Sequence, residues 1–240
     1  MKIASITGVT KSQELTVTKS IGGLILAIDG LALSALTNEK ISVYIERANG
    51  SNVILSNKVL LKDFILASTF GSEATQSDST YETIALCELA HQGGIILGEK
   101  ESIKINLDDL DATKTYDVFG IEEPVGTNDL FFFEQKTVAS EEFSKFVDVK
   151  GFDLAIMTTH ASVNDLSYRY SNGQVVKYLP FELQTLSRDI DVIQAINGTS
   201  VLQGLSDRIS LPLVEVDTIE INKSQGAVIN FVVRSIKNVS

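Results

Sequence analysis

Apolar and polar residues alternate with a period of two along much of this chain, and this pattern constrains the fold more than any other feature. Ile41–Glu46 alternates in this way, and Val53–Leu55 is a second apolar run. Between them lies the turn Ala48–Ser51, which contains the dipeptide Asn49-Gly50. A period of two is that of a β-strand, and Asn-Gly between apolar runs favours a type I′ turn, in which both residues have positive φ. We therefore predict a β-hairpin here.

The same alternation predicts strands through the rest of the chain, whereas helical periodicity is sparse. Two short segments, Asn57–Ser68 and Phe181–Ile193, have apolar residues at helical spacing. Turn signals separate the predicted strands at intervals typical of a β-sandwich or barrel, so the fold class is all-β. Further strands are expected at Glu14–Thr18, Leu24–Ile28, Thr83–Leu89, Ile95–Leu97, Ser102–Leu107, Tyr116–Ile121, Phe146–Val149, Leu154–Thr158, Leu166–Tyr170, Gln174–Tyr178, Leu213–Val216, Thr218–Ile221 and Ala227–Arg234.

Features of the first half recur in the second half in the same order. A second Asn-Gly pair, Asn172-Gly173, again precedes one of the two helical segments. Upstream, Leu26–Ile28 resembles Leu154–Ile156. Downstream, Thr115–Phe119 resembles Ala227–Phe231. Each match is short, but their shared order favours a duplicated β-sandwich. One large sandwich with similar hairpins is the alternative.

The boundary between the two halves is expected in a segment that begins and ends with polar residues. We predict a first domain over residues 1–122, a linker over 123–141 and a second domain over 142–240. Phe131, Phe132 and Phe133 lie inside this linker. Three consecutive phenylalanines in a linker more often dock into a groove between domains than stand in water. As residues of an exposed apolar loop, they are expected to be anchors at an interface.

The composition is that of a protein with a well-packed core, and it excludes several classes of partner. The 240 residues are 44% hydrophobic and carry a net charge of −11. Residues 1–120 contain 10 basic and 15 acidic side chains, and residues 121–240 contain 10 and 16. Neither half has the basic patch that binds phosphates or anionic lipids, so no direct contact with nucleic acid is expected. No signal peptide or bilayer-spanning run is visible, so we expect a soluble protein made in a reducing compartment.

The residues that usually carry catalysis are few and scattered. Cys87 lies in the apolar run Ile84–Leu89, where a thiol is normally buried and inert, although His91 follows close behind. His160 is far from His91 in the sequence, and two separated histidines do not supply the cluster that a catalytic metal needs. We therefore expect no catalytic residue, no bound cofactor and no enzymatic activity.

The most acidic loop is the main candidate for a metal ion, and Asp189 with Asp191 is a weaker candidate of the same kind. Asp108, Asp109, Asp111 and Asp117 could supply oxygen ligands to calcium. The loop lacks the ligand spacing of an EF-hand, and a solvated turn is the alternative interpretation. Calcium is therefore a weak hypothesis.

In each half a hairpin leads into a short helical segment, at Val43–Ser68 and at Leu166–Ile190. This arrangement resembles the double jelly-roll major capsid proteins of tailless icosahedral viruses, especially lipid-containing bacteriophages. The resemblance covers nearly the whole chain and is architectural, because the family has no diagnostic motif. It implies two tandem jelly-roll β-sandwiches per subunit, with a short helix after a hairpin in each half, and homotrimeric, pseudo-hexagonal capsomers that form an icosahedral shell.

The resemblance also implies a set of partners and a location. The partners are further copies of the same chain, minor capsid or vertex proteins, and an internal membrane. The location is the virion, after synthesis in the host cytoplasm.

Three other classes of protein stay open. A tandem β-sandwich binding module, such as a phage accessory or fibre protein or an adhesin, would be a monomer or an elongated fibre. An enzyme on a jelly roll would bind a metal and have carboxylates with shifted pKa values. A structural protein with one undivided sandwich is the last alternative.

Overall fold

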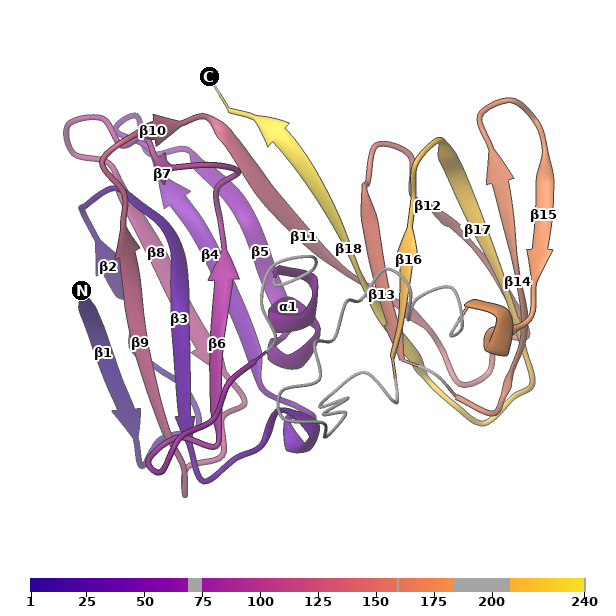
Figure 1. Ribbon diagram of the computed structural model, residues 1–240, viewed down its shortest axis with the longest axis horizontal. Helices are drawn as coiled ribbons and strands as arrows, with labels where there is room; N and C mark the ends of the chain where they lie inside the picture. Colours follow the sequence, from indigo (N-terminus) through magenta and orange to yellow (C-terminus); the bar gives the residue numbers. More distant parts are fainter. Residues whose placement is uncertain (69–74, 159, 184–207, 240) are drawn as a thin grey trace, which may run out of the picture. The chain divides into compact units, whose positions relative to one another are not determined.

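The computed structural model describes residues 1–68, 75–158, 160–183 and 208–239, and these are mostly β-strand (Figure 1). Contacts between residues divide the chain into two compact units. The first unit comprises Met1–Glu134 together with Ile236–Ser240, and the second comprises Gln135–Ser235. Among the described residues, no helix is both long and apolar enough to cross a membrane.

The first unit is a sandwich of two sheets. One sheet has the strand order β1-β9-β3-β6, and in the other β5, β4, β8 and β2 are neighbours in that order. A short parallel pair, β7 with β10, and the 3-10 helix η1 complete the unit with the helix α1. The bounds are β1 Lys2–Thr7, β2 Leu15–Val17, β3 Ile21–Asp29, η1 Leu33–Ala35, β4 Lys40–Glu46, β5 Asn52–Leu60, α1 Leu61–Ser68, β6 Thr83–Glu88, β7 Gly94–Ile95, β8 Ser102–Asp108, β9 Thr115–Glu122 and β10 Gly126–Thr127.

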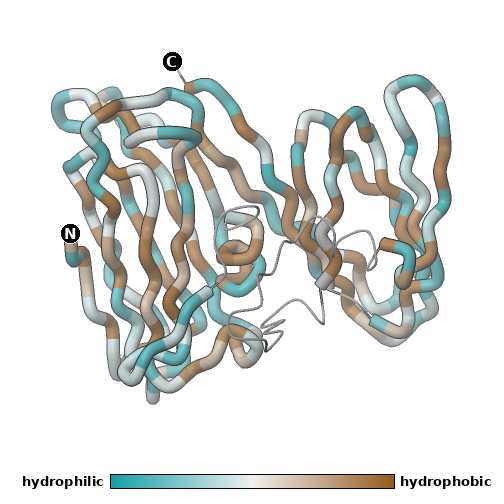
Figure 2. The backbone as a smooth tube through the Cα atoms, viewed as in Figure 1, coloured by the Kyte–Doolittle hydropathy of each residue, from teal (hydrophilic) through white to brown (hydrophobic). Residues whose placement is uncertain are grey.

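The alternation of the sequence explains why these strands form and what they bury. In β4 and β8 every second residue is an aliphatic side chain with no exposed surface, as at Ile41, Val43 and Ile103. The residues between them are polar, and Figure 2 shows the resulting change of hydropathy along the strands. Burial of aliphatic side chains on one side of each strand is the main force that holds such a sandwich together.

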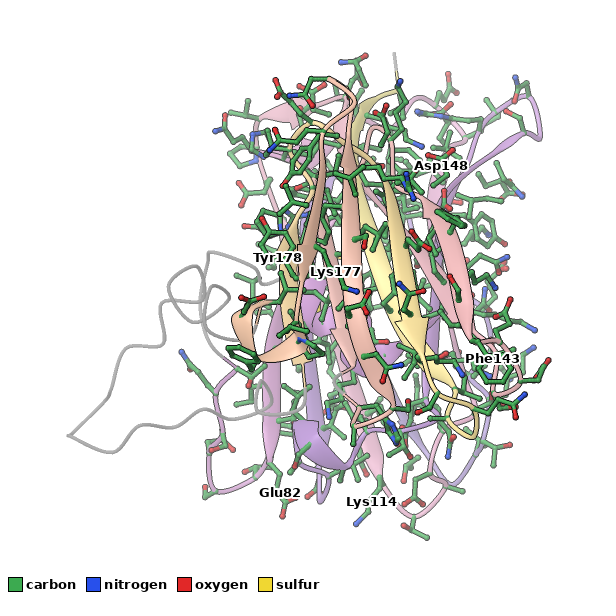
Figure 3. The ribbon with its side chains drawn as sticks, turned by 90° about the vertical axis from the view of Figure 1, so that its right-hand side faces the viewer. Glu82, Lys114, Phe143, Asp148, Lys177 and Tyr178 are labelled. Atoms are coloured by element: carbon green, nitrogen blue, oxygen red, sulfur yellow. The ribbon has the colours of Figure 1, made fainter. Side chains whose placement is uncertain are left out.

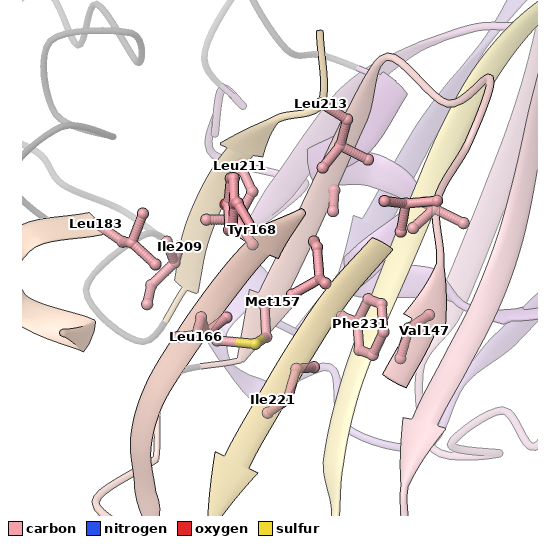
Figure 4. Close-up of a cluster of buried hydrophobic side chains, with 14 of the residues drawn as sticks. Val147, Met157, Leu166, Tyr168, Leu183, Ile209, Leu211, Leu213, Ile221 and Phe231 are labelled. Atoms are coloured by element: carbon pink, nitrogen blue, oxygen red, sulfur yellow. The ribbon is translucent and has the colours of Figure 1, made fainter. Parts of the chain in front are cut away.

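The second unit is also a sandwich of two sheets. One has the order β16-β13-β18-β11 and the other β12-β17-β14-β15. The core lies between them, and Figure 4 shows part of it, including Met157, Leu166 and Phe231. Both β11 and β18 run from one unit into the other. The bounds are β11 Asp129–Val138, β12 Ser144–Asp148, β13 Leu154–Thr158, β14 Val163–Tyr170, β15 Val175–Tyr178, β16 Arg208–Pro212, β17 Val216–Lys223 and β18 Ile229–Asn238.

The two sandwiches have the same topology. Apart from the short strands β7 and β10, the described residues of each form eight strands, and in both the first, eighth, third and sixth are neighbours in one sheet. The second, seventh, fourth and fifth are neighbours in the other sheet. This is the order of a jelly roll. In both, helix follows the fifth strand, as α1 in the first unit and at residues 180–183 in the second. The predicted fold class is therefore confirmed, and the chain is a tandem pair of jelly rolls.

The short sequence matches fall on equivalent strands. Leu26–Ile28 lies in β3 and Leu154–Ile156 in β13, each the third strand of its unit. Thr115–Phe119 lies in β9, and Ala227–Phe231 ends in β18, each the eighth strand. Both Asn-Gly pairs connect a fourth strand to a fifth. The order of these matches therefore reflects the duplicated jelly-roll topology of the two units.

The type of turn at the two hairpins differs from the prediction. Gly50 and Gly173 have φ of +81° and +85°, whereas Asn49 and Asn172 are not among the residues with positive φ. A type I′ turn needs positive φ at both residues, so it is not the turn used here. The chain instead makes a β-turn that is followed by a left-handed glycine, the usual form of a three-residue hairpin connection.

Two predicted elements begin or end elsewhere. Residues 57–60 continue β5 instead of starting a helix, because they pair with β4 through contacts such as Val59 with Ile41. A strand predicted at Leu213–Val216 is wrong: a turn in which Val216 N donates to Leu213 O lies there. The strand β16 precedes this turn. Most of the predicted helix Phe181–Ile193 lies outside the described residues.

The segment predicted as a linker is not an irregular connection. Residues 123–141 contain β10 and β11, and the two compact units meet between Glu134 and Gln135, inside this segment. The polar residues at both of its ends suggested a loop. Leu130 and Val138 in β11 are fully buried, and this burial makes the segment a strand.

Candidate assembly surfaces

The three consecutive phenylalanines do not stand exposed as expected. Phe131 and Phe133 are 4% and 2% exposed, and the Phe133 ring lies 4.7 Å from the Phe64 ring of α1. Phe132 keeps part of its surface accessible, and the Lys237 ammonium lies 5.1 Å from its ring centre. The expectation of exposure is therefore wrong for two of the three, because β11 places alternate residues on the buried side. An anchoring role at an interface stays a prediction for Phe132 alone.

The environment of Cys87 is that of a core residue. Its side chain has no exposed surface, and burial raises the pKa of the thiol to about 12. A thiol with this pKa is protonated at neutral pH and is a poor nucleophile. His91 packs its ring edge-on against Phe131, with ring centres 5.8 Å apart.

His160 makes local contacts in the turn that precedes β14. Its Nδ1 lies 2.9 Å from the Ser162 hydroxyl and accepts a hydrogen bond from the Ser162 backbone N–H at 3.1 Å. These contacts fix the direction of the ring and shape the turn.

The acidic side chains proposed for calcium each have a separate role. Asp108 pairs with Lys11 at 3.1 Å, and Asp109 pairs with Lys40 at 2.7 Å. Asp111 accepts hydrogen bonds from the backbone and hydroxyl of Thr113 in its own turn, which lower the pKa of its carboxyl. Across the described part of the chain, no three histidine, cysteine or acidic side chains gather as metal ligands would.

The fourth candidate, Asp117, lies on β9 and is 5% exposed. It accepts hydrogen bonds from the Tyr81 hydroxyl at 2.6 Å and the Lys2 ammonium at 3.1 Å. Burial raises the pKa of Asp117, but the hydrogen bonds to it outweigh this effect, so its pKa lies below the ordinary value. The residue is thus an ionised carboxylate on the outward side of the first sheet.

The outward side of the sheet β1-β9-β3-β6 carries a band of apolar side chains. Ile25 in β3 lies directly opposite Leu86 in β6 and Phe119 in β9, so the three share one face. Ile84 and Ile121 lie on the same face in the adjoining rows of pairs. All of them are partly exposed, whereas the residues that alternate with them point into the core and are buried. We call this surface the apolar face, defined by Ile25, Ile84, Leu86, Phe119 and Ile121.

The outward side of the other sheet of the first unit is polar. Lys104 of β8 lies 3.5 Å from Glu14 and 3.3 Å from Glu46, and Tyr44 donates a hydrogen bond to Glu14. That hydrogen bond raises the pKa of Tyr44 to about 12. This face therefore satisfies its own charges with a network of polar side chains. On the opposite side of the sandwich, the ion pair of Lys2 with Asp117 lies beside the apolar face, and the Lys2 ammonium is 5.6 Å from the ring centre of Phe119.

In the second unit, the outward side of β12-β17-β14-β15 combines ion pairs with an exposed ring. Figure 3 shows side chains of this unit, with Lys177 and Asp148 labelled. Arg169 lies 3.0 Å from Glu220, and its guanidinium is 5.1 Å from the ring centre of Phe146. Lys177 lies 2.8 Å from Asp165. We call this surface the charged face, defined by Phe146, Asp165, Arg169, Lys177 and Glu220.

The exposure of these ions is unequal. The side chains of Arg169 and Lys177 are 45% and 61% exposed, whereas their partners Glu220 and Asp165 are 20% and 12% exposed. Burial raises the pKa of Asp165, but the hydrogen bonds from Lys177 and Asn222 outweigh it, so the carboxyl has a pKa below its ordinary value. The charged face thus presents two cations and one aromatic ring to the solvent, above the covered carboxylates that pair with these cations. Asp148 of β12 is exposed on the same side.

Sequence reasoning did not identify the apolar face. The signal was present in β3 and β6, where residues in both phases of the alternation are apolar, as in Thr83–Glu88. A strand that is apolar on both sides is covered on both sides in a parallel sheet, or it faces a partner.

No known family model matches this chain, and no curated protein does either. Solved structures do match it. The chain is similar to "the major capsid protein P2 from Bacteriophage PM2", with 11% identity, a TM-score of 0.57 and coverage of 100% of this chain and 95% of that one. It is also similar to a chain of the structure of Sulfolobus Turreted Icosahedral Virus, with 8% identity, a TM-score of 0.62 and coverage of 100% and 90%. A crystal structure titled "STIV MCP" matches with 8% identity and a TM-score of 0.58, over 98% of this chain and 94% of that one. At these identities the likeness is one of fold: the double jelly roll is shared along the full length.

Proposed function

We propose that this protein is a major capsid protein, the repeated subunit of an icosahedral viral shell. The observation that carries the proposal is that the tandem jelly roll matches, over nearly its whole length, proteins whose titles name a phage capsid protein and an icosahedral virus. The chain spans 95% of the phage protein, so the likeness is not confined to one module.

The subunit would assemble as homotrimers with a pseudo-hexagonal outline. The apolar face supports self-association, because large apolar side chains that share one sheet face are normally covered by a partner. Two jelly rolls in each of three chains would give six similar sandwiches around one axis. Units with such a hexagonal outline can tile a surface without gaps.

Further partners follow from the same proposal. Neighbouring trimers would form the shell, minor proteins would occupy its vertices, and a membrane would lie inside it. The protein would be made in the host cytoplasm and end in the virion, with no catalytic role. The net charge of −11 is consistent with a shell that does not bind DNA directly.

The test is the mass of the purified protein by light scattering, with negative-stain images of the same fraction. Three copies of 26.1 kDa, about 78 kDa, in particles of hexagonal outline are expected. A monomer of 26.1 kDa at high concentration would contradict the proposal and favour the alternative, a tandem binding module without catalysis.

A further inference from the structure

The apolar face is matched in the second unit by a set of side chains that are buried. In β13 and β18, Leu154, Ile156 and Val232 alternate with residues of the core cluster and so point to the other side of their sheet. They are nevertheless at most 1% exposed. The corresponding sheet of the first unit has its outward apolar residues partly exposed. Both jelly rolls therefore have apolar side chains on the outward side of the corresponding sheet. In the second unit these side chains are buried, whereas in the first unit they are partly exposed to solvent.

The charges near the two faces are complementary. Asp29 and Glu88 lie on the outward side of β3 and β6, at the ends of the apolar face. Asp117 lies on the same side and pairs with Lys2, so the carboxylates among these four residues outnumber the one cation. The charged face presents Arg169 and Lys177 to the solvent, beside the Phe146 ring, which belongs to a residue that is 57% exposed. An aromatic ring flanked by cations suits an apolar band that has carboxylates at its ends.

We infer that the apolar face of one copy packs against the charged face of a second copy. This inference rests on the proposed function and adds to it the surfaces through which the copies meet. The contact is heterologous, because each copy contributes a different surface. A heterologous contact leaves one free surface of each kind at the ends of an open chain, and repetition of the contact closes a ring when the rotation permits.

The experiment uses one charge-introducing variant in each face. Ile25→Asp places a carboxylate in the middle of the apolar face, and Phe146→Asp replaces the exposed ring of the charged face. The matched control is Ile54→Asp, which makes the same change at an isoleucine that is 55% exposed and lies opposite Tyr44 on the polar sheet face. Masses are measured by light scattering for each variant and for an equimolar mixture of the first two.

The expected result is that each of the two variants alone is a monomer and that Ile54→Asp assembles as the unaltered chain does. The mixture is expected to give a heterodimer of two 26.1 kDa chains, because one intact apolar face meets one intact charged face. Formation of this heterodimer also shows that both variants are folded. Leu86→Asp serves as a second variant of the apolar face, with the same expectation.

Other outcomes separate this inference from the proposed function. If the unaltered chain assembles and both variants assemble as well as it does, the assignment of the faces is overturned and the capsid proposal stands. If Phe146→Asp alone dimerises and the mixture gives no heterodimer, the apolar faces of two copies pack against each other, and the heterologous contact is overturned. A monomeric unaltered chain overturns both.

Discussion

Gly50 and Gly173 occupy the same position in two turns with the same hydrogen bonds. Gly50 N donates to Arg47 O at 2.9 Å, and Gly173 N donates to Tyr170 O at 2.9 Å. In each turn the preceding asparagine accepts a hydrogen bond at 2.9 Å from the backbone N–H two residues on. The two jelly rolls thus agree in the detail of a loop as well as in strand order.

Replacement of either glycine by alanine is expected to cost about 1–2 kcal/mol of stability, because a side chain is disfavoured in the left-handed region. A Cβ at Gly50 or Gly173 would meet no atom within 4 Å, so only the backbone conformation opposes the change. Asparagine tolerates this conformation better and is the matched control at each site. Urea unfolding of the four variants measures the loss. Equal stability of the alanine and asparagine variants would contradict this account.

Cys87 is expected to resist thiol reagents in the folded protein. Its thiol has no exposed surface and a pKa of about 12, so the reactive thiolate is scarce up to strongly alkaline pH. Iodoacetamide at pH 8 should label the protein only when urea is added, as mass spectrometry would show. Rapid labelling in native buffer would disagree with a core position.

Asp165 is expected to stabilise the fold in its ionised form. Its pKa in the folded state is below the ordinary 3.8, so its contribution is present above that pH and disappears as the pH falls through the folded-state value. Asp165→Asn should cost about 1 kcal/mol at pH 7, since its partner Lys177 is largely exposed. The difference in the free energy of unfolding between the variant and the unaltered chain should disappear below pH 3.8. Asp148→Asn, at an exposed position of the same sheet, is the control. A gap that persists in acid would show that the effect is not one of charge.

The sequence was sufficient for the strand pattern and the duplication, but not for the outward surfaces. The alternation over Ile41–Glu46 predicts a strand with one buried side and one polar side, and it also predicts which residues point into the core. In Ile21–Asp29 both sides are apolar, so the sequence reports burial without showing which side remains uncovered. The strand β1 was not predicted, because its pairing with β9 is set by residues more than a hundred positions away. Long-range pairing of this kind leaves little trace in local sequence.

Phe132 and Phe133 are expected to respond differently to substitution. Phe133→Ser should cost about 3–5 kcal/mol, because it removes a buried ring that packs on Phe64. Phe132→Ser should leave the unfolding midpoint nearly unchanged, and it is the variant with which to test a role of this segment between copies. Loss of assembly with retained stability would support that role. Assembly equal to that of the unaltered chain would remove it.

Removal of the residues after Ser235 is expected to destabilise the first unit by about 2 kcal/mol, through several lost hydrogen bonds. Asn238 Nδ2 donates to Asp129 at 2.7 Å, and Val239 N donates to Asn128 O at 3.0 Å. Arg47 also donates to Val239 O at 3.4 Å. Asn238→Ala removes one of these bonds and should show about half of the effect. Hydrogen exchange would locate the change in the first unit, and an effect confined to the second would contradict the assignment.

The membership of residues 236–239 in the first unit has a consequence for the order of synthesis. On the ribosome, these residues emerge only after the whole of Gln135–Ser235 has been made. The first jelly roll therefore lacks these residues while the second is being made, and the second lacks its eighth strand, β18, until nearly the same point. One strand thus completes both jelly rolls: residues 229–235 of β18 belong to the second, and the residues that follow belong to the first.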